Sequence, residues 1–330
     1  MMSKLDRWRR ALVGGGALMS ALLASCGGGS QVQTFMPDRV IAFGDETSVI
    51  DDFMGNGNGR KYTVNATVSA TDPTLACQQN PLWIQAVAST HGLVFPQCNP
   101  QPNPAVAPTS RIRATAGAKA ADIAAQIDAQ LGQSAFTTKD LTTVLVGQND
   151  ILAQYAQYPS VSAATLLENV GAAGTALGDQ VNRIANAGAK VLISTVPDLG
   201  VTPFAVTERA AHTDTDRAVL LSVLTKAFND RMRSRIINDG RMIGLILTDE
   251  YIQSVVRIVN GGGFTNVIDG VCDLSKSALV PPSLLDCTNL TLVAGGNGTS
   301  YLWADATHLS SGGQAALGSL ATARAANNPF

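Results

Sequence analysis

The chain has 330 residues, of which 45% are hydrophobic and 15% charged, and its formal net charge is −2. This length and composition allow a large buried core, in one big domain or two small ones, and exclude a disordered or fibrous protein. Removing the four basic residues and one acid of the N-terminal leader leaves 19 basic and 24 acidic residues, a net charge of −5. This mild, evenly spread acidity argues against a nucleic-acid partner.

Residues 1–25 predict a bacterial lipoprotein signal peptide. A basic segment, Lys4 to Arg10, precedes an apolar run over 11–24 that is too short to span a bilayer in a mature protein. The run ends in Leu-Ala-Ser-Cys, which resembles a lipobox, so Cys26 is expected to carry the lipid and residues 26–36 to form a flexible tether. The alternative is ordinary secretion. In either case the protein leaves the cytoplasm.

The first strand, residues 40–43, is uniformly apolar, as a strand buried on both faces of a parallel sheet should be. Four further strands are predicted at 111–115, 142–146, 190–194 and 242–247. Helical patterns lie at 81–91, 120–131, 165–187, 216–238 and 310–325. This alternation predicts one α/β domain over residues 37–330, with a doubly wound, parallel, five-stranded sheet in three layers.

Four cysteines remain after the leader, and they predict two disulfides. In an oxidising compartment the simplest of the three connectivities pairs nearest neighbours, Cys77 with Cys98 and Cys272 with Cys287. Each bond would close a short loop and contribute about 3 kcal/mol by chain entropy. Each would also pin an irregular segment, and these segments are expected to shape a substrate cleft. Zinc ligation is the alternative, although no close Cys-x-x-Cys or Cys/His cluster supports it.

The first strand runs into Gly44-Asp45 and then into a helix-compatible segment. Such a turn presents the next residue at the carboxyl edge of the sheet, where open α/β sheets bind ligands. That residue is Glu46. Its carboxylate is expected at a helix N-terminus, where the macrodipole stabilises negative charge.

Near the C-terminus, Asp305 and His308 have the residue types and spacing of a base and the carboxylate that orients it. An isolated Asp-x-x-His pair is weak evidence, because the same spacing is also found in surface ion pairs at helix N-termini. Two other positions are just as ambiguous in isolation. Asn149, in a Gly-Gln-Asn-Asp turn, reads as a turn residue or helix cap, and Gly117 as a strand-to-helix turn.

Taken in order, these blocks resemble the GDSL (SGNH) ester hydrolases, in their esterase and lysophospholipase branch, over about residues 40–325. The resemblance implies an SGNH-type fold with flavodoxin-like strand order and no metal or cofactor. It also implies His308 as the base and Asp305 as its orienting partner. The Asn149 side chain and the Gly117 backbone N–H would be the oxyanion donors.

The family's nucleophilic serine would fall at position 46, where this chain has Glu46. Glu46 could be a built-in anion that fills the oxyanion hole and keeps His308 protonated. It could instead be a carboxylate nucleophile or activate a water. Thr47 or Ser48 could replace the serine, although on a helix they point roughly 100° and 200° away from residue 46. Finally, Glu46 could be a capping acid on a site that has lost its chemistry. The sequence leaves these alternatives open.

The expected function is hydrolysis of a carboxylic ester, on an acyl lipid or an acetylated glycan, in the bacterial envelope. The expected partners are this substrate and the membrane, through a lipid on Cys26 that faces the periplasm or the exterior. The competing class is a non-catalytic lipoprotein that keeps the pocket to bind an ester or glycan.

Overall fold

Five parallel strands form the centre of the described chain. The structure is a computed structural model that describes residues 35–100, 107–258 and 261–330. The strands are β1 (Arg39–Gly44), β4 (Arg111–Ile112), β5 (Asp140–Leu145), β6 (Lys190–Ser194) and β7 (Ile243–Ile246). Their order is β4-β1-β5-β6-β7, and every neighbouring pair is parallel. This is the flavodoxin-like order, so the predicted sheet is confirmed.

Helices cover both faces of this sheet because alternate residues of each strand face opposite sides. On β1, Ile41 and Phe43 belong to one core cluster, and Val40 and Ala42 to the other. The first face is covered by α3 (Ile123–Gln133), α5 (Ala163–Asn186) and α7 (Arg217–Arg235). The second is covered by α2 (Trp83–Ser89), α8 (Thr248–Arg257) and α9 (Ser311–Asn327). The predicted three layers are confirmed.

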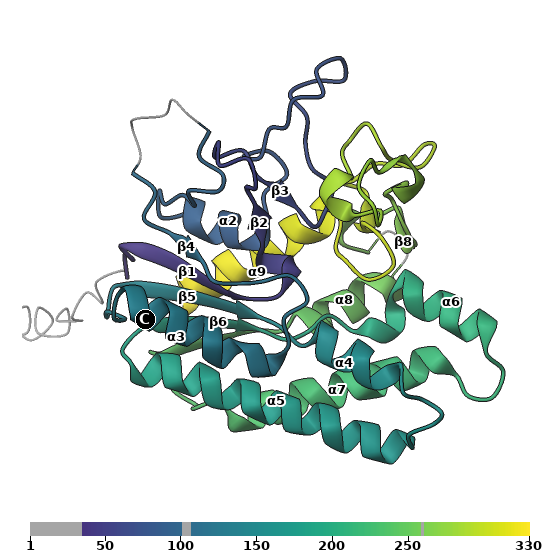
Figure 1. The fold of residues 1–330 in the computed structure, drawn as a ribbon. Helices are drawn as coiled ribbons and strands as arrows, with labels where there is room; N and C mark the ends of the chain where they lie inside the picture. Colours follow the sequence, from purple (N-terminus) through teal and green to yellow (C-terminus); the bar gives the residue numbers. More distant parts are fainter. Residues whose placement is uncertain (1–34, 101–106, 259–260) are drawn as a thin grey trace, which may run out of the picture. The chain divides into compact units, whose positions relative to one another are not determined.

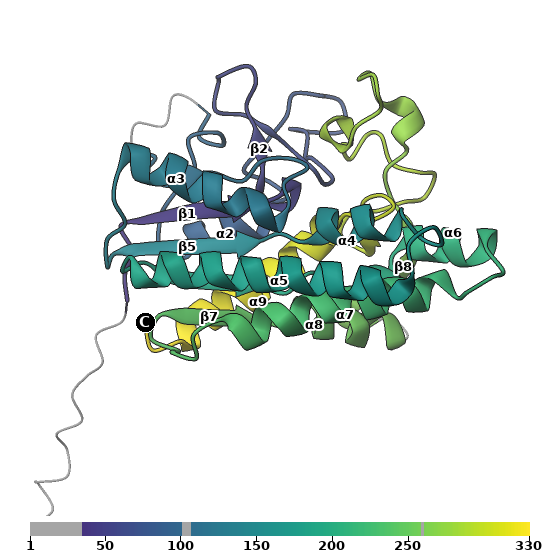
Figure 2. The same cartoon turned by 60° about the horizontal axis from the view of Figure 1, so that its bottom comes forward.

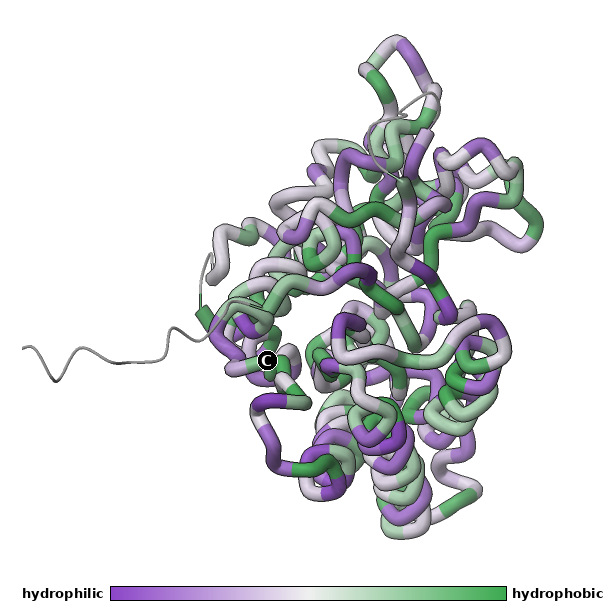
Figure 3. Tube along the Cα trace, turned by 90° about the vertical axis from the view of Figure 1, so that its left-hand side faces the viewer, coloured by the Kyte–Doolittle hydropathy of each residue, from purple (hydrophilic) through white to green (hydrophobic). Residues whose placement is uncertain are grey.

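The longest helices, α5 and α7, lie side by side in two views (Figures 1 and 2). The tube at the bottom of Figure 3, where these helices lie, alternates between hydrophilic and hydrophobic residues. On α5 the buried side chains include Leu166, Val170 and Leu177, which recur at helical spacing. This periodicity is the reason that the sequence predicted the long helices.

The sequence analysis missed three shorter helices: α4 (Gln148–Tyr155), α6 (Pro203–Ala211) and α8. It also expected a helix after Gly44, where the structure has a single 3₁₀ turn, Glu46–Ser48. The chain then enters β2 (Ile50–Asp51), which pairs antiparallel with β3 (Arg60–Lys61). One turn has no aligned peptide dipoles to sum, so the argument that a helix macrodipole stabilises Glu46 is wrong.

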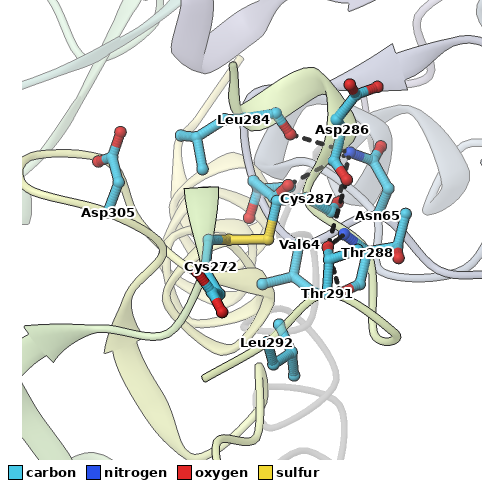
Figure 4. The surroundings of a disulfide bond; sticks show 12 residues. Val64, Asn65, Cys272, Leu284, Asp286, Cys287, Thr288, Thr291, Leu292 and Asp305 are labelled. Atoms are coloured by element: carbon cyan, nitrogen blue, oxygen red, sulfur yellow. Dashed lines mark hydrogen bonds between the residues drawn. A yellow bond between two sulfur atoms is a disulfide. The ribbon is translucent and has the colours of Figure 1, made fainter. Parts of the chain in front are cut away.

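Both predicted disulfides, Cys77–Cys98 and Cys272–Cys287, are present, which excludes the zinc alternative for these four cysteines. Figure 4 shows the second bond beside Asn65. The Asn65 backbone and side-chain N–H groups both donate to the Cys287 carbonyl, at 2.9 and 3.0 Å. This contact joins the early irregular segment to the late one, which contains β8 (Asn266–Gly270) and β9 (Tyr301–Trp303).

The predicted signal peptide, Cys26 and the tether up to residue 34 lie outside the described residues. Within the part of the chain that is described, no helix is both long and apolar enough to cross a membrane.

Candidate active site

The ends of β1 and β5 position two of the predicted site residues. These strands are neighbours, and the strand order reverses between them, which is the point where open α/β sheets bind ligands. Gly44 ends β1 with a φ of 134°, and a Cβ there would lie 1.9 Å from the Leu145 carbonyl oxygen. Only glycine therefore allows the turn that places Glu46 at this edge. Asn149 lies in the first turn of α4, directly after β5.

The Glu46 carboxylate is the centre of a closed hydrogen-bond cluster. Its Oε2 accepts the Gly117 backbone N–H at 2.8 Å and the Asn149 Nδ2–H at 3.1 Å. Its Oε1 lies 3.3 Å from His308 Nε2, and the residue is 6% exposed. Burial alone would raise the pKa of this carboxyl, but the bonds from His308 and Gly117 outweigh it and lower the pKa to about 2. Glu46 is therefore an anion held by both predicted oxyanion donors.

His308 lies between two carboxylates. Its Nδ1 is 2.9 Å from both side-chain oxygens of Asp305, and Asp305 Oδ1 also accepts the His308 backbone N–H at 2.8 Å. Burial alone would lower the pKa of His308, but Asp305 and then Glu46 raise it to about 10. The predicted Asp305–His308 pair is thus formed, with the imidazole held as a cation that donates from both nitrogens.

The sequence analysis missed Asp45 as part of this cluster. Its side chain is 1% exposed and accepts the Thr47 backbone N–H at 3.0 Å. Burial and the neighbouring charge of Glu46 raise the pKa of Asp45 to about 7. Its position between Gly44 and Glu46, at a buried strand end, was the signal that could have identified it.

Neither alternative nucleophile is placed to react. Ser48 is fully buried, and its hydroxyl accepts the Trp83 indole N–H at 3.1 Å. Among the described residues, the Thr47 hydroxyl forms no hydrogen bond with His308. The Nε2 atom of His308 is hydrogen-bonded to Glu46 instead. Of residues 46–48, Glu46 is therefore the one whose side chain is hydrogen-bonded to His308.

The two donors are held in place by neighbouring contacts. Asn149 also donates to the Ala118 carbonyl at 3.1 Å, and Asp150 accepts the Ala120 backbone N–H at 2.9 Å. These bonds tie the Gly117 loop to the start of α4, so both N–H groups point at the same carboxylate oxygen. Asp150 thus has a positioning role. Tyr62 is a further neighbour that the sequence did not reveal, since its ring centroid lies 6.5 Å from that of His308.

Residues 81–321 of the chain match the model of a protein family described as GDSL-like Lipase/Acylhydrolase. Gly117, Asn149, Asp305 and His308 lie within the matched residues, whereas Glu46 precedes them. A comparison with curated proteins finds no match.

Among solved structures, the lipase Lip_vut3 from a goat rumen metagenome is 13% identical with a TM-score of 0.48, over 88% of this chain and 99% of that one. The acetyl xylan esterase AlAXEase is 13% identical with a TM-score of 0.39, over 86% of this chain and 96% of that one.

Proposed function

Because the chain belongs to the GDSL-like lipase/acylhydrolase family, we propose that its site binds and hydrolyses carboxylic esters. One observation carries the proposal: the Gly117 N–H and the Asn149 Nδ2–H converge on a single oxygen at 2.8 and 3.1 Å. These are the distances expected of donors that stabilise an oxyanion. Oε2 of Glu46 occupies the place where the charged oxygen of the reacting ester would lie. His308 Nε2 lies 3.3 Å from the other carboxylate oxygen, Oε1, and Asp305 holds the imidazole through Nδ1, on the opposite side of the ring.

In this proposal Glu46 is the nucleophile. Its Oε1 attacks the ester carbonyl carbon, and the negative charge passes to the ester oxygen, which takes over the two donors. His308 gives its Nε2 proton to the leaving alcohol oxygen as the ester C–O bond breaks, which leaves a mixed anhydride on Glu46. Neutral His308 then takes a proton from a water that attacks the acyl carbon. The carboxylic acid leaves, and the Glu46 carboxylate and the His308 cation are restored.

The basicity of Glu46 limits which esters react. A carboxylate whose pKa is lowered to about 2 is a much weaker nucleophile than a serine alkoxide. It expels a phenolic oxygen, whose conjugate acid has a pKa of about 10 as in tyrosine, more readily than an alkyl alkoxide. We therefore expect slow turnover, with aryl esters preferred.

Ester binding without turnover is the second candidate function. It is favoured by the observation that both Glu46 oxygens already have partners, since Oε2 is held by two donors and Oε1 faces His308. A substrate oxygen must displace this buried anion before the donors can serve it. A site that keeps the anion in place would bind an ester or glycan and leave it intact.

The N-terminal sequence supports a location in the bacterial envelope. A signal peptide over residues 1–25, a lipidated Cys26 and a tether over residues 26–36 would place the site beside a membrane. Ester groups within reach there include those of acyl lipids and acetylated glycans.

Hydrolysis of p-nitrophenyl acetate and p-nitrophenyl palmitate by the full chain in detergent tests this function. We expect slow wild-type hydrolysis that Glu46→Gln and His308→Ala abolish. Glu168→Gln, which changes an exposed carboxylate on α5, is the control and should match wild type. If the wild type hydrolyses neither ester and the Glu46→Ser variant does, Glu46 is not a nucleophile and the binding function is favoured.

A further inference from the structure

The loop of residues 305–308, which contains both Asp305 and His308, is bound by a helix outside the reacting centre. The Ala306 carbonyl accepts the Phe204 backbone N–H at 2.9 Å. Phe204 is the second residue of α6. The N–H groups in the first turn of a helix have no partner within that helix. One of these free donors of α6 therefore holds the backbone of the 305–308 loop.

The first turn of α6 leaves this donor for the loop. Pro203, the first residue, has no N–H, and the Ala205 N–H donates to the Thr202 hydroxyl at 3.2 Å. Thr202 and Ala205 are fully buried. The start of α6 is thus fixed within the fold, so the Phe204 N–H is held in one orientation.

A second helix contacts the same loop. Gln148, the first residue of α4, donates from Nε2 to the Thr307 hydroxyl at 3.2 Å. The next residue, Asn149, is one of the two donors to Glu46 Oε2. The start of α4 therefore contacts both Glu46 and the 305–308 loop.

Tyr155, the last residue of α4, joins the two helices, which lie side by side (Figures 1 and 2). The residue is 5% exposed, and its hydroxyl donates to Glu208 Oε2 on α6 at 2.6 Å. Its ring packs edge-on against Phe204, with the ring centroids 5.8 Å apart. Burial and the neighbouring Glu208 raise the pKa of Tyr155, so the phenol stays protonated and donates at neutral pH.

The other partner of the Glu208 side chain does not reach α4. It is His212, whose Nε2 lies 3.4 Å from Glu208 Oε2. His212 directly follows α6, so this contact stays at one end of the same helix. Within the described part of the chain, Tyr155 is thus the hydrogen-bond partner that ties Glu208 to another helix. Because α6 also packs on α7, we expect the helix to stay folded when this bond is removed.

The position of α6 bears on one distance in the site. Asp305 and His308 lie in the same loop, so the bonds between them move with it. His308 Nε2 and Glu46 Oε1 lie 3.3 Å apart, and they belong to segments that are anchored separately. This distance is already long for a hydrogen bond. A displacement of α6 would therefore weaken the Glu46–His308 contact and leave the Asp305–His308 bonds intact.

We propose that Tyr155 is a positioning residue. Its bond to Glu208 holds α6 against α4, and α6 in turn holds the 305–308 loop where His308 meets Glu46. Tyr155 acts through α6 and needs no contact with a substrate. The proposal concerns the contact between two side chains of the resting protein, so it does not rest on the proposed reaction.

NMR titration of the His308 imidazole in the full chain tests this role, with the signal assigned by its loss in His308→Ala. Tyr155→Phe removes the hydroxyl and keeps the ring against Phe204. We expect it to lower the proton affinity of His308 about tenfold, from a pKa of about 10 to about 9 or lower. Glu208→Ala should have the same effect. Glu208→Gln loses the same charge but keeps an oxygen that accepts the bond, so it should match wild type.

A merely structural role would lower the free energy of unfolding without changing this pKa, because His308 titrates in the folded protein. Tyr158→Phe is the matched control. It also removes a tyrosine hydroxyl, which is bonded to the Thr215 hydroxyl at 2.9 Å, and both residues lie outside α4 and α6. The pKa of His308 in this variant should equal that of wild type.

The proposal is overturned if Tyr155→Phe and Glu208→Ala leave the pKa of His308 unchanged, or if Tyr158→Phe or Glu208→Gln lowers it as much. A lowered pKa in a protein that hydrolyses no p-nitrophenyl ester would keep the positioning role and reject the proposed reaction. Ester hydrolysis by the wild type, with an unchanged pKa of His308 in Tyr155→Phe, would do the reverse.

Discussion

Glu46→Gln removes a negative charge from the centre of the site and keeps the size of the side chain. It leaves the buried His308 cation with Asp305 as its remaining carboxylate partner. In the folded protein the pKa of Glu46 falls from 4.5 to about 2. Since a tenfold change in ionisation is worth about 1.4 kcal/mol, the native contacts favour the carboxylate by roughly 3 kcal/mol. We expect the substitution to lower the free energy of unfolding by about 2–3 kcal/mol at pH 7.

The pH dependence of this loss has a definite sign. The folded-state pKa lies below the unfolded one, so the stabilisation is fully present above about pH 4.5 and is lost as the pH falls through about 2. Urea unfolding at pH 7 and pH 3 measures it, and at pH 3 the difference from wild type should shrink to roughly 1.4 kcal/mol. Glu168→Gln should stay within about 0.5 kcal/mol of wild type at both pH values. A loss below about 1 kcal/mol at pH 7, or one that does not shrink at pH 3, would refute the reasoning.

Two further predictions follow from the same contacts, and a third follows from the Cys77–Cys98 disulfide. Glu46→Ser should raise kcat/KM for p-nitrophenyl acetate at least 100-fold, because it frees both donors and supplies a hydroxyl. Adding His308→Ala to this variant should remove the gain. Equal rates for Glu46→Ser and wild type would contradict the prediction. His308 should titrate with a pKa of about 10 by NMR. Its contribution to the free energy of unfolding is then present below pH 6.5 and lost as the pH rises through 10. An observed pKa near 6.5 would contradict the ion pairs with Asp305 and Glu46. Replacing Cys77 and Cys98 with serine should lower the free energy of unfolding by about 3 kcal/mol in urea, and a loss under about 1 kcal/mol would show that the loop is ordered without the bond.

The local patterns of the sequence were sufficient for the architecture. Apolar runs predicted the strands of the sheet, and helical spacing predicted α5, α7 and α9, because burial on a sheet selects side chains at regular intervals. The short loops between cysteines predicted both disulfides. The helices α4, α6 and α8 were missed because they have only 8, 9 and 10 residues, too few turns for an apolar pattern to repeat. The segment after Gly44 has helix-compatible residues but forms one 3₁₀ turn.

The sequence by itself determined which residue types meet at the carboxyl edge of the sheet, and that a glutamate stands at position 46. Only the tertiary structure decided which groups surround that glutamate. Its partners Gly117, Asn149 and His308 are 71, 103 and 262 residues away along the chain. The charge on a buried carboxylate is set by the distance to its donors and by the loss of water, and neither quantity is encoded in the neighbouring residues.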